Sequence, residues 1–258
     1  MIGGHERLVI FDGVLQPWQY IDTPYVYQNI HTLGYHPYNL SAHIVALNAA
    51  AKALFNAELS VSVQDIENQI NALLTNQRLS LNVSICVVLK LYASGEYSLE
   101  NTEPSIYQGY ALRGLRPEAC FMYQRPDVSG HPSSATLAAR NMANAMAKRE
   151  NIHTAIILDS NDNVLFEPAQ PLFCVIDNVV TLPQSSIESV ELSIAEKAAR
   201  RCGLKVYHKS ISREMLESAD EVLIASWQGI TSISCIDDQF EYHWTVIAER
   251  IAESMKEG

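Results

Sequence analysis

The sequence predicts an α/β fold built from two domains. The chain has 258 residues, a length that suits one large domain or two smaller ones. Stretches with the apolar period of a helix alternate with short apolar stretches typical of buried strands. Residues 124–132 contain two prolines and one glycine and have no apolar period. We therefore expect a smaller N-terminal α/β domain over 1–120, a linker over 121–132 and a larger C-terminal α/β domain over 133–258.

The composition is that of an ordinary globular protein. Apolar residues make up 48% of the chain, charged residues 18%, and the mean hydropathy is −0.02, which excludes a disordered chain or a coiled coil. The net charge of −11 excludes nucleic acid as an expected partner, because an acidic surface repels phosphate backbones. No apolar run is long enough to span a membrane, and residues 1–7 lack the apolar core of a signal peptide. We expect a cytoplasmic protein with no membrane partner.

The cysteines do not form a recognisable framework. The chain has five, an odd number at wide spacing, with no Cys-x-x-Cys pair. Such cysteines are typical of reduced thiols, and no His, Cys or Asp set has the spacing of metal ligands. We expect no disulfide and no metal site.

The N-terminal half begins with a strand and turn over 8–15, where Asp12-Gly13 is the turn. Five tyrosines then fall between positions 20 and 38. Apolar residues at helical spacing predict helices over 39–57 and 62–75, with Ser41 and Ser62 as their N-caps. We also expect a buried strand over 82–93 and further strands at Leu112 and over 119–123.

In the C-terminal half, helices and short strands alternate. Asp177-Asn178 has the composition of a hairpin turn, and Gly203 stands in the position expected of a helix C-cap. We expect helices over 134–150, 186–202 and 244–256, and strands over 154–158, 164–167, 172–176, 179–182, 204–208 and 221–225.

The order of these elements, together with two motifs, resembles a known family. The motifs are Tyr27-Gln-Asn-Ile-His31 and Tyr38-Asn-Leu-Ser-Ala-His43-Ile-Val-Ala-Leu47, followed later by the helix from Leu137 to Glu150. The chain resembles the class IV aminotransferases of pyridoxal-phosphate fold type IV, which include branched-chain and D-amino-acid aminotransferases and aminodeoxychorismate lyase. The resemblance covers residues from about 20 to about 240. It implies a two-domain D-amino-acid aminotransferase-like fold, pyridoxal phosphate as cofactor, and a homodimer with its sites at the domain and subunit boundary.

The residues that hold and use the cofactor in this family are largely replaced here. The resemblance puts the imine-forming lysine at a position before Ala147-Lys148 where this chain has Leu137. No lysine occurs between Lys90 and Lys148. The arginine of the family's His-x-x-Arg-Leu motif, which contacts the cofactor phosphate, corresponds to Ala46.

Two phosphate-binding segments also differ. The family's Gly-Ile-Thr helix start corresponds to Ser189-Val-Glu-Leu192, in which the glutamate would repel a phosphate. The small hydroxyl turn corresponds to Ala225-Ser-Trp-Gln-Gly229, with an indole in place of a small side chain. The retained element is Glu167, which stands where the family has the carboxylate that pairs with the pyridine nitrogen.

The candidate ligand-binding residues follow from these comparisons, each with a structural alternative. Glu167 is the candidate pyridine partner, or a carboxylate at the end of a strand. Arg140 is a candidate anion-binding residue in the vacated pocket, or one half of a salt bridge. His43 lines a ligand cleft or makes a structural hydrogen bond. The other candidates are Tyr27, with interface packing as its alternative, and Ser226, Trp227 and Gln228, which shape a new pocket or fill the space of a phosphate.

Two lysines are considered as substitutes for the missing one. Lys90 lies within an apolar strand, where burial would depress its pKa and make it nucleophilic, or where it extends to water. Lys148 is expected to be a solvated cation at the end of a helix. We expect a degenerate, non-transaminating homologue that binds a small amino or keto acid in the old cofactor cleft. The alternatives are an active pyridoxal-phosphate aminotransferase or lyase that uses Lys90, and a binding module for another ligand.

Overall fold

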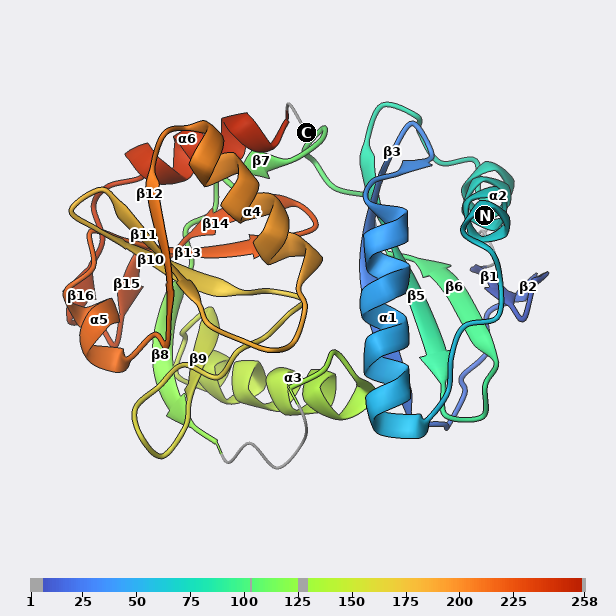
Figure 1. The fold of residues 1–258 in the computed structure, drawn as a ribbon, viewed down its shortest axis with the longest axis horizontal. Coiled ribbons are helices and arrows are strands. Elements are labelled where there is room, and N and C mark those ends of the chain that lie inside the picture. The colour runs from blue at the N-terminus through green and yellow to red at the C-terminus, as the bar shows by residue number, and fades with distance from the viewer. Residues whose placement is uncertain (1–6, 103, 125–129, 257–258) are drawn as a thin grey trace. The chain divides into compact units, whose positions relative to one another are not determined.

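A computed structural model describes residues 7–102, 104–124 and 130–256, and groups them into two compact units (Figure 1). The N-terminal unit extends to Gly109 and includes Pro132–Ser134. The C-terminal unit comprises Tyr110–His131 and the chain from Ala135 onward. Residues 125–129 of the predicted linker lie outside the described residues.

The N-terminal unit is a six-stranded antiparallel sheet in the order β2-β1-β6-β5-β3-β4. Its elements are β1 (Leu8–Phe11), β2 (Val14–Pro17), β3 (Tyr25–Leu33), β4 (His36–Pro37), α1 (Leu40–Phe55), α2 (Val63–Asn76), β5 (Ser84–Tyr92) and β6 (Tyr97–Asn101). Side chains from alternate positions of β3, β5 and β6 pack with both helices in one apolar core. Both helices and the strand over 82–93 were predicted; β3 and β6 were not.

Of the two predicted helix N-caps in this unit, one is confirmed and one is wrong. Ser62 caps α2 as predicted, because its Oγ accepts a hydrogen bond from the Asp65 N–H. The prediction that Ser41 caps α1 is wrong. The helix begins at Leu40, and its N-cap is Asn39. Asn39 has a left-handed conformation (φ 55°), which asparagine tolerates better than most residues do.

The C-terminal unit contains two sheets. Their orders are β12-β11-β10-β13-β14-β7 and β16-β15-β8-β9. The strands are β7 (Ala111–Leu112), β8 (Glu118–Tyr123), β9 (Thr154–Leu158), β10 (Leu172–Ile176), β11 (Val179–Pro183), β12 (Lys205–Lys209), β13 (Glu221–Ser226), β14 (Gly229–Ser232), β15 (Cys235–Ile236) and β16 (Phe240–Glu241). The helices are α3 (Ser134–Arg149), whose first residue groups with the N-terminal unit, α4 (Val190–Arg201), α5 (Arg213–Glu217) and α6 (Val246–Met255).

Two predictions in this unit are wrong. The strand expected over 164–167 does not form. A single bridge joins Leu158 to Val164, after which the chain runs as a loop to Pro168, a residue that cannot donate a ladder hydrogen bond. The helix expected from 186 begins at Val190, because the Ser189 side chain accepts a hydrogen bond from the Leu192 N–H and so fixes the cap there.

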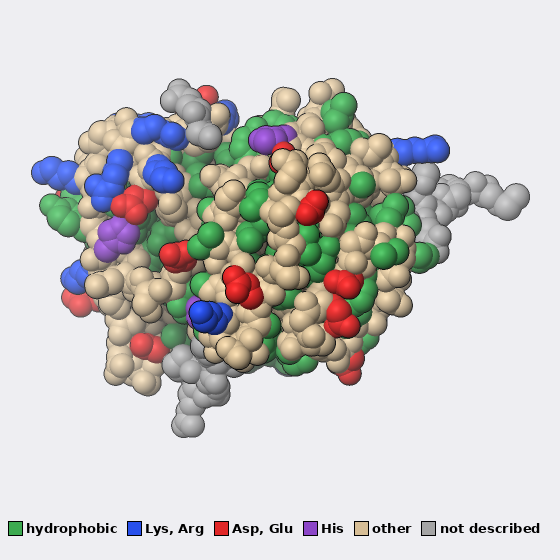
Figure 2. Space-filling view, turned by 45° about the vertical axis from the view of Figure 1, so that its right-hand side comes forward, with side chains coloured by type: hydrophobic (Ala, Val, Ile, Leu, Met, Phe, Trp, Pro, Cys, Tyr) green, Lys and Arg blue, Asp and Glu red, His purple; other side chains and the backbone are tan. Residues whose placement is uncertain are grey.

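Charge is distributed unevenly along the chain. Residues 197–213 contain six Lys and Arg residues and no acidic residue, which leaves twelve basic residues against 29 acidic ones elsewhere. Figure 2 shows Lys and Arg side chains gathered at the upper left of the view.

Among the helices that the structure describes, none has both the length and the apolar character of a membrane span.

Candidate functional site

The predicted site residues fall in both units. The N-terminal unit contains Tyr27, His43, Ala46 and Lys90, and the C-terminal unit contains Leu137, Arg140, Glu167, Ser226, Trp227 and Gln228.

In the N-terminal unit, one face of the sheet carries a group of aromatic side chains around a lysine. The β3–β5 register pairs Tyr27 with Lys90 and Tyr25 with Tyr92, and residues paired in this way point to the same face. Their neighbours Val26 and Leu91 belong to the core on the helix side. The structure therefore brings Tyr27 and Lys90 together on the face opposite α1 and α2.

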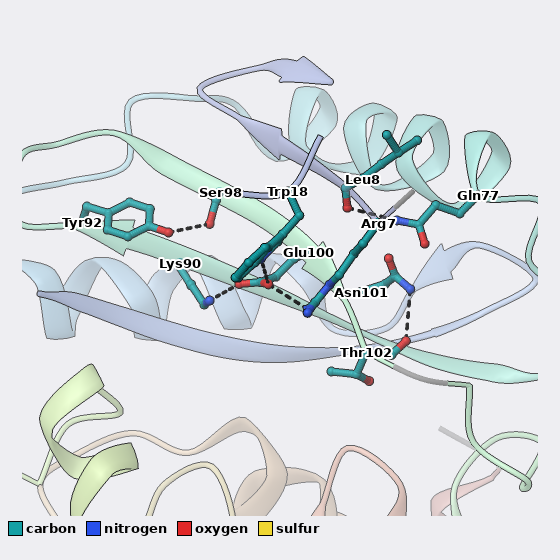
Figure 3. A network of polar contacts seen from close by, with 10 residues as sticks. All are labelled: Arg7, Leu8, Trp18, Gln77, Lys90, Tyr92, Ser98, Glu100, Asn101 and Thr102. Atoms are coloured by element: carbon teal, nitrogen blue, oxygen red, sulfur yellow. Dashed lines mark hydrogen bonds and ion pairs between the residues drawn. The ribbon is translucent and has the colours of Figure 1, made fainter. Parts of the chain in front are cut away.

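Lys90 belongs to an ion-pair network centred on Glu100 of β6 (Figure 3). Lys90 Nζ donates to Glu100 Oε1, while Arg7 Nη2 and Trp18 Nε1 donate to Oε2 at 2.9 and 3.0 Å. The Glu100 side chain is 8% exposed and that of Lys90 is 19% exposed. Lys90 Nζ also lies 4.9 Å from the centroid of the Tyr25 ring, a cation–π distance.

The environment of Lys90 changes its titration. Burial, and next the nearby Arg7 guanidinium, lower the pKa of Lys90 to about 8 from an ordinary value of 10.5. Each of the other six lysines in the chain is exposed. Near pH 7, Lys90 therefore has a larger fraction of neutral amine than a lysine with the ordinary pKa of 10.5.

His43 lies on the other side of the same sheet. Its side chain is buried, and Nδ1 lies 3.0 Å from Gln28 Oε1, on a β3 residue that alternates with Tyr27. Burial, with a smaller effect of His31, lowers the pKa of His43 to about 4, so the ring is neutral and donates its Nδ1 proton to the amide oxygen. Ala46 is also buried on α1. The structure does not bring His43 to the face that holds Lys90.

In the C-terminal unit, the structure joins two of the predicted residues. Arg140 on α3 forms an ion pair with Glu167, which lies in the loop after β9. The two side chains are 19% and 24% exposed. Arg140 Nη1 also donates to the Ala155 carbonyl at 2.6 Å, which fixes the guanidinium against β9. Leu137 lies one turn earlier on α3 and is partly buried.

The N-terminus of α4 is occupied by the chain's own side chains. Ser189 Oγ accepts from the Leu192 N–H at 3.1 Å and donates to the Pro168 carbonyl at 2.5 Å. Glu191, in the first turn, is 4% exposed, and burial raises its pKa to about 8. A protonated carboxyl group therefore stands at this helix start near pH 7.

The turn between β13 and β14 contains the remaining candidates. Ser226 is buried, and its Oγ accepts from the Gln228 N–H at 3.2 Å, while Trp227 is partly buried. Gly229 follows with φ 113°, and a Cβ there would lie 2.2 Å from the Ala111 carbonyl oxygen of β7. The turn is thus held closely against β7.

Sequence reasoning missed the centre of the network in the N-terminal unit. Arg7 is far from Lys90 in the sequence. Glu100 lies on β6, a strand that was not predicted. The alternation of Tyr97 and Leu99 with Ser98 and Glu100 was the available sign, because it has the period of a strand with one polar face.

Comparison with known proteins gives a consistent family and fold. The family model of class IV aminotransferases matches residues 26–236. The branched-chain aminotransferase from Thermoproteus uzoniensis with norvaline is 16% identical and has a TM-score of 0.81, over 97% of this chain and 94% of that one. The T.th. branched-chain amino acid aminotransferase with pyridoxamine 5′-phosphate is 18% identical with a TM-score of 0.80, over 97% and 93%. The Escherichia coli branched-chain enzyme is 17% identical with a TM-score of 0.77, over 96% and 92%. No curated protein sequence matches significantly.

Proposed function

The chain belongs to the class IV aminotransferase family, and we propose that it is a degenerate member that binds a small metabolite and does not transaminate through a lysine imine. The observation that carries this proposal is the absence of lysine from residues 91–147, the segment in which the family's imine lysine is expected. Leu137, the residue aligned with it, offers neither a nucleophile nor a base. Because the whole segment 91–147 lacks lysine, shifting the comparison with the family by a few residues in either direction would still place no lysine at this position.

The contacts around the expected cofactor groups support the same proposal. Glu167, the retained candidate partner of a pyridine nitrogen, is already paired with the Arg140 guanidinium. Ala46 supplies no charge for a phosphate. The Leu192 N–H at the start of α4 is used by Ser189. These residues do not fit pyridoxal phosphate in the manner of the family, so we derive no step through it.

An absorbance titration with pyridoxal phosphate tests this proposal. After incubation and dialysis, we expect no visible band of a protein-bound imine and no lysine modified after borohydride reduction. A band that survives dialysis and disappears with borohydride would contradict the proposal. The same titration of Lys90→Arg identifies the lysine responsible, since arginine keeps the charge and forms no imine.

The second candidate function is an active pyridoxal-phosphate aminotransferase, or an enzyme of the aminodeoxychorismate lyase type, with Lys90 as a relocated lysine. This second function is favoured by the environment of Lys90, which is mostly buried and has a lowered pKa. Turnover of amino-acid and keto-acid pairs by the wild-type protein that is lost in Lys90→Ala would support it. Equal turnover in both proteins would exclude Lys90 as the lysine.

The proposed ligand is a small amino or keto acid. A thermal-shift series with such acids tests this, because a ligand that binds only the folded state raises the melting temperature. The absence of any shift at saturating concentration would count against a metabolite-binding role. The homodimer implied by the resemblance stays a prediction, and sedimentation velocity at several protein concentrations measures it.

A further inference from the structure

A small pocket in the N-terminal unit surrounds the Lys90 amine. Its volume is about 170 Å³, and five of its twelve lining residues are aromatic. The polar lining residues are Lys90, Glu100, Ser98, Gln16 and Gln19. The aromatic lining residues are Phe11, Trp18, Tyr20, Tyr25 and Tyr92. Apolar walls with a few convergent polar groups are typical of small-molecule sites.

The pocket holds a reactive pair and not a lone amine. Glu100 Oε1 accepts from Lys90 Nζ, so a proton can pass between the two groups without further movement. Glu100 Oε2 is fixed by Arg7 and Trp18. Figure 3 shows the Lys90, Arg7 and Trp18 side chains converging on the Glu100 carboxylate. The carboxylate is therefore oriented by contacts that do not involve the amine.

We propose that Lys90 forms an imine directly with a small carbonyl compound of the α-keto acid class bound in this pocket. The inference rests on the proposed function, because it assigns the pocket to a metabolite and not to pyridoxal phosphate. The chemistry needs no cofactor. It makes Lys90 the catalytic nucleophile and Glu100 the acid and base for it.

The step balances with the groups present. The Lys90 ammonium passes one proton to Glu100, and the neutral amine adds to the carbonyl carbon. One N–H proton moves to the former carbonyl oxygen, which gives a carbinolamine. Glu100 returns its proton to that hydroxyl group, the C–O bond breaks and water leaves. The product is a protonated imine beside the Glu100 carboxylate, which stabilises its positive charge.

Charge and size favour a keto acid over other carbonyl compounds. Lys90 and Arg7 carry two positive charges against one negative charge on Glu100, so a ligand carboxylate completes the balance. Arg7 is not one of the lining residues, and it acts through Glu100, whose Oε2 accepts from Arg7 Nη2 at 2.9 Å, so its charge favours an anionic ligand without direct contact. A volume of 170 Å³ equals that of roughly five or six molecules of liquid water. This suits a keto acid of a few heavy atoms.

Reductive trapping with pyruvate tests the proposal. The purified full chain, without added pyridoxal phosphate, is incubated at pH 7 with pyruvate and cyanoborohydride and then mapped by mass spectrometry. We expect one lysine, Lys90, to gain the mass of pyruvic acid less one oxygen atom. Its neutral fraction at this pH is about 300-fold that of an ordinary lysine, which gives the selectivity. No adduct, or a similar yield on exposed lysines such as Lys52, would overturn the proposal.

Three variants sharpen the result. Lys90→Arg keeps an ion pair with Glu100 and should give no adduct, whereas Lys52→Arg should label as the wild type does. Glu100→Gln should slow labelling of Lys90 by about 100-fold. In the wild type the labelling rate should rise with pH up to about 8 and level off above it, whereas a lysine with the ordinary pKa of 10.5 would show a rate that keeps rising beyond pH 8. The wild-type peptide map decides the question even if a variant fails to fold.

The result is separable from the test of the proposed function. A pyridoxal-phosphate imine would contradict the proposed function whatever pyruvate does. A missing pyruvate adduct would remove this inference and leave the proposed function intact.

Discussion

Arg140 on α3 and Glu167 in the loop after β9 form an ion pair that is mostly shielded from water. Arg140 was predicted either to bind an anion or to form a salt bridge, and Glu167 either to pair with a pyridine nitrogen or to be a structural carboxylate; in the structure the two form a salt bridge with each other. The guanidinium is also tied to the Ala155 carbonyl. This ion pair therefore connects the loop that follows β9 to α3.

Removal of one partner should destabilise the protein, because it leaves a partly buried charge unpaired. We expect Arg140→Met to lower the free energy of unfolding by about 1.5–3 kcal/mol, measured by urea denaturation. The double variant with Glu167→Gln should recover part of that loss. Arg149→Met, an exposed residue on the same helix, serves as the control. An Arg140 variant as stable as the control would show that the pair contributes nothing.

The His43–Gln28 contact predicts a pH dependence of stability. His43 has a pKa of about 4 in the folded protein against 6.5 ordinarily. Below pH 6.5 the His43 ring takes up a proton in the unfolded chain but not in the folded chain. The free energy of unfolding therefore decreases as the pH is lowered. The contribution is complete above pH 6.5 and is lost as the pH falls towards 4, to a total of about 3 kcal/mol.

Substitution of this histidine should remove that part of the profile. Urea denaturation between pH 7 and pH 4.5 should show a shallower loss of stability for His43→Gln than for the wild type. A His36→Gln variant, at an exposed position, serves as the comparison. Parallel profiles for the wild type and His43→Gln would refute the assignment of a neutral, buried His43.

The close contact of Gly229 with Ala111 predicts a second stability effect. A Cβ at 229 would lie 2.2 Å from the Ala111 carbonyl oxygen, and the backbone has a positive φ. We expect Gly229→Ala to cost about 2 kcal/mol or more. Gly95→Ala is a matched control, since Gly95 has φ 97° and nothing within 4 Å of a Cβ. Thermal denaturation of both variants separates the steric clash from the conformational strain, and equal losses would exclude the clash.

Elements with local determinants were predicted well from the sequence. The Asp177-Asn178 hairpin forms, with both residues in the left-handed conformation that a tight two-residue turn requires. Ser62 caps α2 through a residue three positions away. Gly203 follows α4 with φ 74°, as glycine commonly does after a helix. Each of these features depends on residues that are neighbours in the chain.

The network around Lys90 could not be predicted, because its parts are distant in sequence. Arg7 and Glu100 are 93 residues apart and meet only when β1 pairs with β6. Strand β3 is buried on most of both faces, so its sequence lacks the clean alternation of a half-exposed strand. The resemblance located Arg140 and Glu167 as candidates, but their mutual pairing depends on the path of the loop, for which a strand was expected.

The last prediction concerns Glu221, a charged residue buried at the start of β13. Its two carboxylate oxygens accept from the N–H groups of Ile247 and Ala248 at 2.8 and 2.9 Å, and the residue is 2% exposed. It therefore caps α6 from another element, where Thr245 makes no side-chain cap hydrogen bond.

Because these two N–H groups have no solvent to replace the carboxylate, Glu221→Ala should lower the free energy of unfolding by about 3 kcal/mol. Glu221→Gln keeps one acceptor and should lose less. Glu253→Ala, at an exposed position on α6, controls for loss of charge. Hydrogen exchange of the first turn of α6 should accelerate in Glu221→Ala before the protein unfolds globally. Unchanged protection of that turn would mean that α6 is held by its apolar face alone.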